Sequence, residues 1–124
     1  MLVSPCTFED VKHMRSMARN EHVELEQCTE MYAFCIDNHP VGCIGASKMR
    51  NGWRIKCLYV MPKWREQGIG LSLIKAAING KEGKITAFAT DASVGLFASL
   101  DIKAQKTRQV RVKGKLVNIH YVSS

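Results

Sequence analysis

The sequence predicts a mixed α/β (α+β) fold in which a mainly antiparallel sheet is flanked by about four helices. Three observations support this prediction. Short apolar segments alternate with turn residues through the middle and the end of the chain. Other segments repeat apolar residues at helical spacing. The chain has 124 residues, of which 46% are hydrophobic, so we expect a single domain with one core over residues 1–124.

The first quarter of the chain is predicted to be helical. Thr7 can cap a helix that has Asp10 at its third position, and apolar residues follow at helical spacing. This pattern predicts a helix over about 8–19. The polar, acidic stretch over 20–30 predicts a short second helix, and a strand before the first helix is left open.

The middle of the chain is predicted to form a three-stranded antiparallel meander. A strand over 32–37 leads through the turn at 38–40 into a second strand over 41–46. Asn and Gly at 51–52 favour a tight hairpin turn, which leads into a third strand over 54–61.

The rest of the chain alternates between the two periodicities. The apolar spacing after the meander predicts a helix that stops near Gly80, and a Lys-Gly pair predicts the last hairpin turn, at 113–114. The expected elements are a helix over about 68–79, a strand over 84–89, a helix capped by Asp91, and strands over about 104–112 and 115–122.

The segment 57–74 has the features of an anion site. A strand-forming run ends at Pro62, a polar loop follows, and Arg-x-x-Gly-x-Gly over 65–70 opens a helix. Backbone N–H groups at a helix N-terminus have no internal partner, glycines admit a close ligand, and the helix dipole favours negative charge. The chain contains no Walker A string, and Leu73 replaces the third glycine of a dinucleotide fingerprint.

This segment resembles the core motif of the GNAT family, the GCN5-related N-acetyltransferases. That motif reads roughly Leu-x-Val-x-Pro-x-x-Arg/Gln-x-x-Gly-x-Gly-x-x-Leu-hydrophobic. The matching residues are Leu58, Val60, Pro62, Arg65, Gly68, Gly70, Leu73 and Ile74. The order of the expected elements also matches the family, so the resemblance covers nearly the whole chain. It implies a GNAT-like fold and direct transfer of an acetyl or other short acyl group from acyl-CoA to a primary amine.

The resemblance also implies site residues. The backbone of Leu58 would polarise the thioester, and the loop would cradle the pyrophosphate of coenzyme A. Arg65 is the side chain expected to pair with a phosphate, since a guanidinium matches that geometry, and Glu66 is expected to point away. The implied cofactor-binding residues are Leu58, Tyr59, Val60, Arg65, Glu66, Gln67, Gly68, Ile69, Gly70, Leu71 and Thr90.

The general acid and base are not assigned. Phe97 stands where many family members have the tyrosine that protonates the thiolate, and Arg54 stands where some have a basic glutamate. These departures favour an alternative reading, a catalytically degenerate GNAT-like domain that binds acyl-CoA or a partner. The candidate proton-transfer residues are Tyr59, Tyr121, His120, Ser99, Glu24 and Glu26.

Charge is unevenly distributed along the chain. The net charge is +7, but residues 1–38 hold three basic and seven acidic side chains, whereas residues 101–124 hold six and one. The acidic segment predicts either an acceptor-side wall that attracts a cationic amine or a solvated helix face. A nucleic-acid-binding domain is a third reading, which no recognised motif supports, and we expect no nucleic-acid partner.

The five cysteines form no Cys-x-x-Cys pair and, with the four histidines, fit no zinc spacing, so we expect reduced thiols and no metal. No apolar run approaches the ~20 residues of a membrane span, and the N-terminus lacks the features of a secretory signal. We therefore expect a cytoplasmic location without membrane contact. The expected partner is an amine acceptor, which is a small molecule or a protein lysine or N-terminus, and the protein is a monomer or a homodimer.

Overall fold

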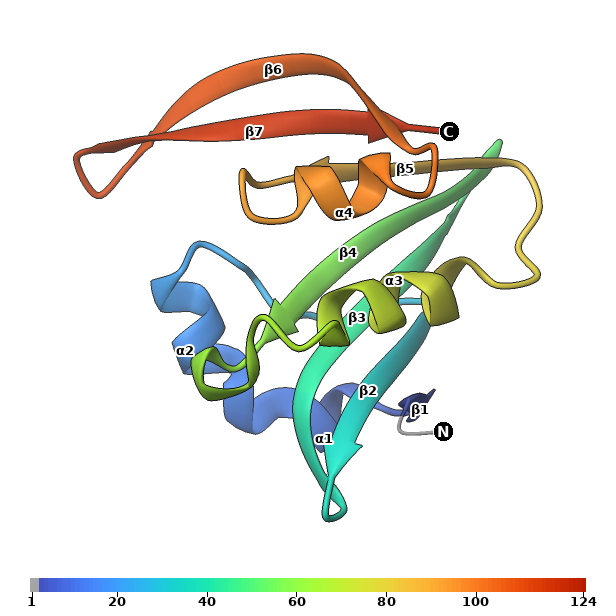
Figure 1. Ribbon diagram of the computed structural model, residues 1–124, viewed down its shortest axis with the longest axis vertical. Coiled ribbons are helices and arrows are strands. Elements are labelled where there is room, and N and C mark those ends of the chain that lie inside the picture. Colours follow the sequence, from blue (N-terminus) through green and yellow to red (C-terminus); the bar gives the residue numbers. More distant parts are fainter. Residues whose placement is uncertain (1–2) are drawn as a thin grey trace.

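The computed structural model describes residues 3–124, so Met1 and Leu2, the start of the segment tested for a secretory signal, lie outside it. Its centre is a seven-stranded sheet in the order β1-β2-β3-β4-β5-β7-β6 (Figure 1). The strands are β1 Val3–Pro5, β2 Glu30–Ile36, β3 His39–Met49, β4 Gly52–Val60, β5 Lys84–Ala89, β6 Lys103–Val112 and β7 Lys115–Ser123. Among the strands of the described residues, β4 and β5 are the only pair that runs in parallel. The prediction of a mixed fold with a mainly antiparallel sheet is confirmed.

The helical start of the chain differs from the prediction in two ways. Thr7 and Asp10 form the expected capping box, but the single helix predicted over 8–19 is divided into three pieces: α1 Phe8–Val11, the 3-10 turn η1 Lys12–Met14 and α2 Arg15–Asn20. The helix predicted over 20–30 is wrong. After α2, His22 adopts a φ of 68°, and the segment runs irregularly until β2 begins.

Packing explains why this acidic segment is not helical. Leu25 and Cys28 are buried, so an irregular chain fills the face of the sheet that α1 and α2 leave open. Burial of these two side chains stabilises the irregular conformation more than helix formation would, because a short polar segment forms a helix of little stability on its own.

The meander is confirmed, with β2, β3 and β4 paired antiparallel. The predicted hairpin turn leads directly into β4 at Gly52, where a Cβ would collide with the backbone of Lys84 on the neighbouring chain segment. The turn therefore requires glycine for close approach as well as for conformation. Lys113 and Gly114 form the second hairpin turn, between β6 and β7, as predicted.

Three helical segments follow β4, which are the 3-10 turn η2 Pro62–Trp64, α3 Ile69–Ile78 and α4 Val94–Ala98. The prediction that Asp91 caps the last helix is wrong, because Ser93 precedes its first turn. Asp91 instead accepts hydrogen bonds from Asn118 and His120 of β7, and the pairing with His120 lowers the pKa of the carboxyl.

The two faces of the sheet carry separate cores. Helices α3 and α4 cover one face, where Ile44, Leu73, Ile74 and Phe97 are buried, and we call this the α3 face. Helices α1 and α2 and the segment after them cover part of the other, the α2 face, where Met14, Leu25, Cys57 and Tyr59 are buried. Within residues 3–124, no helix is long and apolar enough to cross a membrane.

Candidate active site

Strands β4 and β5 separate at the carboxyl end of β4. Their parallel pairing ends with Ile55 opposite Ala87, although β4 continues to Val60 (Figure 1). On its other edge β4 remains paired with β3 as far as Val60. The stretch of β4 that contains Leu58 therefore has no strand partner on its β5 side among residues 3–124.

A β-bulge lies at the point of separation. The register between β3 and β4 shifts so that Cys57 and Leu58 together oppose Ile44. Cys57 has a φ of 60°, a left-handed conformation that a non-glycine residue rarely adopts. As a result, Cys57 lies in the α2-face core, next to Lys56 on the same face, while Leu58 packs against the α3-face core. The bulge thus turns β4 away from β5.

The loop after β4 ends in the free amide end of α3. The hydrogen-bond ladder of the helix begins with the Ser72 N–H, which donates to the carbonyl of Gly68 at 3.1 Å. The backbone N–H groups over 69–71 precede this bond and have no helical acceptor. Gly68 has a φ of 80°, and a Cβ built on it would meet nothing within 4 Å. This end of α3 can therefore receive an anion from open space.

Some of the other loop residues pack against the core, and the rest are exposed. A Cβ on Gly70 would lie 3.1 Å from the Leu96 side chain of α4, so this glycine serves the close contact between α3 and α4. Ile69 is buried, whereas Glu66 and Gln67 are exposed. Thr90, at the end of β5, donates its backbone N–H to Ser93 Oγ at 3.1 Å and forms the turn that begins α4.

Arg65 makes a contact that the sequence did not reveal. Its Nη2 lies 2.8 Å from Glu21 Oε2 at the end of α2, and its Nε donates to the carbonyl of Val60. The Tyr59 hydroxyl donates to the same Glu21 oxygen at 2.8 Å. The hydrogen bond from Arg65 lowers the pKa of Glu21, while burial and the bond to Glu21 raise that of Tyr59 to about 12. The guanidinium expected to meet a phosphate is engaged with a carboxylate.

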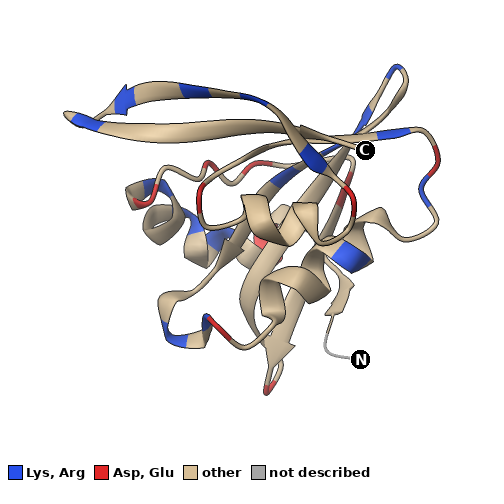
Figure 2. Cartoon of the chain, turned by 45° about the horizontal axis from the view of Figure 1, so that its top comes forward, with Lys and Arg blue, Asp and Glu red and all other residues tan. Residues whose placement is uncertain are grey.

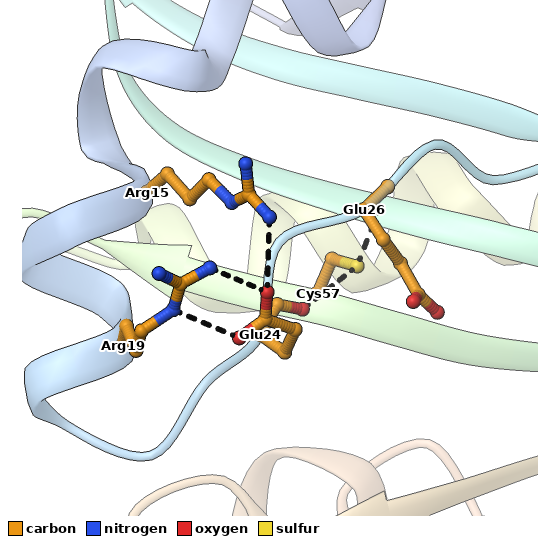
Figure 3. Close-up of polar contacts among 5 residues, drawn as sticks. All are labelled: Arg15, Arg19, Glu24, Glu26 and Cys57. Atoms are coloured by element: carbon orange, nitrogen blue, oxygen red, sulfur yellow. Dashed lines mark hydrogen bonds and ion pairs between the residues drawn. The ribbon is translucent and has the colours of Figure 1, made fainter.

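Glu24 and Glu26, two candidate bases, lie in the irregular segment after α2 (Figure 3). Glu24 accepts from Arg19 at 2.9 Å and from Arg15, and the bonds from Arg19 lower the pKa of Glu24. Glu26 forms an ion pair with Lys56 of β4. Glu24 is therefore stabilised in its charged, weakly basic form.

The same pairing overturns the expectation of an acidic acceptor wall. Glu21, Glu24, Glu26 and Glu30 each have a basic partner, and for Glu30 this is Lys81 at 2.8 Å. The local negative charge that the sequence suggested is neutralised by Arg15 and Arg19 nearby in the chain and by Lys56, Arg65 and Lys81 from more distant parts of it.

The remaining proton-transfer candidates are engaged elsewhere. His120 lies 2.7 Å from Asp91 and 2.8 Å from the Thr107 hydroxyl, and the Ser99 hydroxyl donates to the carbonyl of Leu96 at 2.7 Å. Phe97, at the family's tyrosine position, is 2% exposed and belongs to the α3-face core. Tyr121 lies beside Phe88 on the α2 face, with ring centroids 5.5 Å apart.

The thiols are free, and three of them, Cys28, Cys43 and Cys57, lie together at the bulge, where Cys43 Sγ donates to the carbonyl of Cys57 at 3.4 Å. Cys28 and Cys57 have sulfurs 3.7 Å apart, and the S–H of Cys57 also points to the carbonyls of Glu24 and Glu26. The hydrogen bond from Cys57 lowers the pKa of Cys28 to about 7, and raises that of Cys57 together with burial. Among residues 3–124, no group of three or more His, Cys, Asp or Glu side chains could hold a metal ion.

A strand that separates from its parallel neighbour at a bulge, and then leads into a glycine loop and a helix start, defines an acyl-CoA-dependent transferase fold. The model of the acetyltransferase (GNAT) domain matches residues 4–120, and this chain belongs to that family. The resemblance seen in the sequence is therefore confirmed over nearly the whole chain. Members of the family use acyl-CoA.

Solved structures agree with this assignment. A ribosomal-protein-alanine N-acetyltransferase from Brucella melitensis superposes with a TM-score of 0.76 at 14% identity, over 100% of this chain and 99% of that one. An N-acetyltransferase from Staphylococcus aureus gives 0.76 at 12%, over 98% and 96%. Arabidopsis thaliana NAA60 in complex with acetyl-CoA gives 0.73 at 11%, over 98% and 96%. At these identities the likeness shows the fold alone. Comparison with curated proteins gives no significant match.

Proposed function

We propose that this protein is an N-acyltransferase that moves an acetyl group from acetyl-CoA, or another short acyl group, directly to a primary amine. One observation carries the proposal. The β4 edge at Leu58, which lacks a strand partner on its β5 side, leads through a short loop to the free amide end of α3. An anion-binding end and a hydrogen-bonding strand edge are thereby linked in one continuous segment.

The residues present fit this cofactor. Backbone groups over 66–71 would hold the pyrophosphate, with Gly68 leaving room for its approach, because open space lies where a side chain would project. The β4 edge over 58–60 would bind the pantetheine arm by main-chain hydrogen bonds. Thr90 directly follows β5, the strand from which β4 separates. We propose that Arg65 contributes mainly by fixing the loop to α2, since Glu21 holds its guanidinium.

When bound, acetyl-CoA supplies a thioester whose carbonyl carbon is the electrophile and whose sulfur is the leaving group. The backbone of Leu58 would donate to the carbonyl oxygen, where negative charge develops as the amine attacks. This role needs no particular side chain, so the apolar Leu58 suffices. Tyr59 lies on the opposite face and donates to Glu21, so we assign it to positioning of Arg65 rather than to protonation of the thiolate.

The five free thiols support a reducing location, and we propose the cytoplasm. The second candidate function is a degenerate domain that binds acyl-CoA without turnover. Phe97 favours it, because the phenyl ring at this buried position offers no acid.

Two measurements test the proposal. Acetyl-CoA should raise the melting temperature by mass action, and release of free coenzyme A thiol should depend on added primary amine. A melting temperature that acetyl-CoA leaves unchanged would reject both candidate functions. Binding without amine-dependent thiol release, across small amines, lysine peptides and peptides with a free N-terminus, would favour the degenerate domain.

A further inference from the structure

The α2 face of the sheet is open over its C-terminal half. Directly paired residues of neighbouring strands share a face, and Phe88 of β5 pairs with Tyr121 of β7, which pairs with Lys106 of β6. Two residues along, Ile119 pairs with Arg108. Phe88 is 52% exposed although its strand lies inside the sheet, so no helix or loop of the described residues 3–124 covers it. We call this surface the open face.

Arg54 belongs to the same face. It pairs with Thr86, two residues before Phe88, and its guanidinium lies 4.8 Å from the centre of the Phe88 ring. Its Nε also donates to Thr86 Oγ1 at 3.4 Å. The ring and the hydroxyl hold the charge in place, and the outer edge of the guanidinium is left for a ligand.

Among residues 3–124, the charged side chains that strand pairing places on the open face are positive. Arg54, Lys106 and Arg108 form no ion pair within residues 3–124, whereas the four glutamates between 21 and 30 all do. Figure 2 shows basic residues along the β6–β7 hairpin and acidic residues on the loops around the sheet. An apolar, aromatic strip bordered by unpaired cations is complementary to a chain that carries both carboxylates and apolar groups.

This face adjoins the separation of β4 and β5. Arg54 immediately precedes Ile55, the last residue of β4 that pairs with β5, and Phe88 immediately follows Ala87, its partner. Helices α3 and α4 cover the opposite face. An acceptor that approaches Leu58 from the uncovered side therefore passes Arg54 and Phe88.

The basicity of the carboxylates near the site indicates which class of amine would serve as the acceptor. Glu21, Glu24 and Glu26 are all paired with cations, and the hydrogen bonds from arginine lower the pKa of Glu21 and Glu24, which makes these two carboxylates weak bases. A weakly basic site suits an amine that is already unprotonated in solution. At pH 7.5 roughly a third of α-amino groups are neutral, given a pKa of about 7.7–8.0, compared with roughly one in a thousand lysine side chains at about 10.4.

We propose that the acceptor is the free N-terminus of a polypeptide whose first residues include aspartate or glutamate, with the open face as its docking surface. This inference rests on the proposed function and names its substrate class. The α-amine would attack beside Leu58, and an acidic side chain a few residues on would pair with Arg54. Lys106 and Arg108 would meet further carboxylates along the peptide.

Peptides of one length test the inference. Three of the peptides have a free N-terminus. After the first residue, one carries aspartate and glutamate, one carries asparagine and glutamine, and one carries lysine. The fourth peptide has a blocked N-terminus and an internal lysine. We expect acetylation of the acidic peptide to have the highest kcat/KM and to weaken as salt rises. Arg54→Gln should raise KM for the acidic peptide about two- to fivefold, as expected for one exposed ion pair, and leave the neutral peptide unchanged.

Arg50→Gln is the matched control, because it removes the same charge from the exposed turn between β3 and β4, and it should alter neither KM. The inference would be overturned, with acetyl transfer intact, if the neutral and acidic peptides were used equally or if the lysine peptides were preferred. It would also be overturned if a single-stranded RNA competed with the acidic peptide at lower concentration. If acetyl-CoA binds and no peptide is acetylated, the inference fails; the proposed transferase activity fails with it only if small primary amines also give no thiol release.

Discussion

Arg65 Nη2 lies 2.8 Å from Glu21 Oε2, which joins the loop after β4 to the end of α2 across 44 positions of sequence. The Tyr59 hydroxyl donates to the same carboxylate, and the centre of the Tyr59 ring lies 5.5 Å from the Arg65 guanidinium carbon. The three side chains tie the proposed cofactor loop to the helical segment on the α2 face. The loop geometry thus depends on a contact outside the motif that identifies it.

Glu21→Gln should loosen the loop and raise KM for acetyl-CoA more than it lowers kcat. The amide keeps the size of the side chain but loses the charge that holds Arg65. Because both partners are about 40% exposed, we expect a loss of stability of at most ~1 kcal/mol. The control is Glu82→Gln, which removes an exposed carboxylate after α3. Equal effects of the two substitutions on KM would contradict this role for Glu21.

The same pair predicts a pH dependence. The folded-state pKa of Glu21 is lowered, so its contribution to stability is present above the unfolded value, near 4.5, and is lost as pH falls through the lower folded value. Unfolding free energies of wild type and Glu21→Gln should therefore converge as pH falls from about 5, above the unfolded value, through the lowered folded value. Denaturant titrations over this range measure the difference, and a gap that stays constant with pH would show that the pair is not the cause.

Gly68 offers a sharp test of the anion site. Gly68→Asn and Gly68→Asp share nearly the same shape and tolerate φ above zero better than most residues, but only Asp places a negative charge at the amide end of α3. We expect Asn to weaken acetyl-CoA binding modestly and Asp to abolish it in calorimetry. Gly80→Asp is the matched control, since Gly80 also has a positive φ and open space but lies beyond the other end of α3. Equal binding by both Gly68 variants would reject the site.

Lys81 should stabilise the fold far more than a surface lysine. Its side chain is 6% exposed, lies 2.8 Å from Glu30, and has its Nζ 4.9 Å from the Trp53 ring and 5.4 Å from that of Tyr32. Lys81→Ala should cost ~1–3 kcal/mol, from a lost ion pair, cation–π contacts and packing. Lys75→Ala, on the exposed side of α3, should cost less than ~0.5 kcal/mol. Equal midpoints in urea for the two variants would contradict this assignment.

Local signals predicted the fold and the loop well, and long-range contacts explain what they missed. The Gly52 turn, the Gly114 turn and the glycine loop before α3 each have a short-range signature, and each lies where the sequence indicated. The irregular segment after α2 is determined by burial of Leu25 against the sheet, which no local pattern contains. The engagement of Arg65 by Glu21 likewise follows from tertiary structure alone.

Substitutions of Phe97 distinguish two possibilities: a transferase in which the main chain polarises the thioester, and a domain that has lost its catalytic acid. Phe97 is buried in the α3-face core. If the Leu58 backbone carries the chemistry, Phe97→Leu should lower stability by ~1–2 kcal/mol and leave kcat nearly unchanged. Phe97→Tyr should keep or raise kcat. Phe97→Ala should cost ~3–5 kcal/mol of stability, because it leaves a cavity. Amine-dependent thiol release and urea midpoints measure the two effects separately. A well-folded Phe97→Leu protein with kcat reduced tenfold or more would mean that the ring touches the reacting groups.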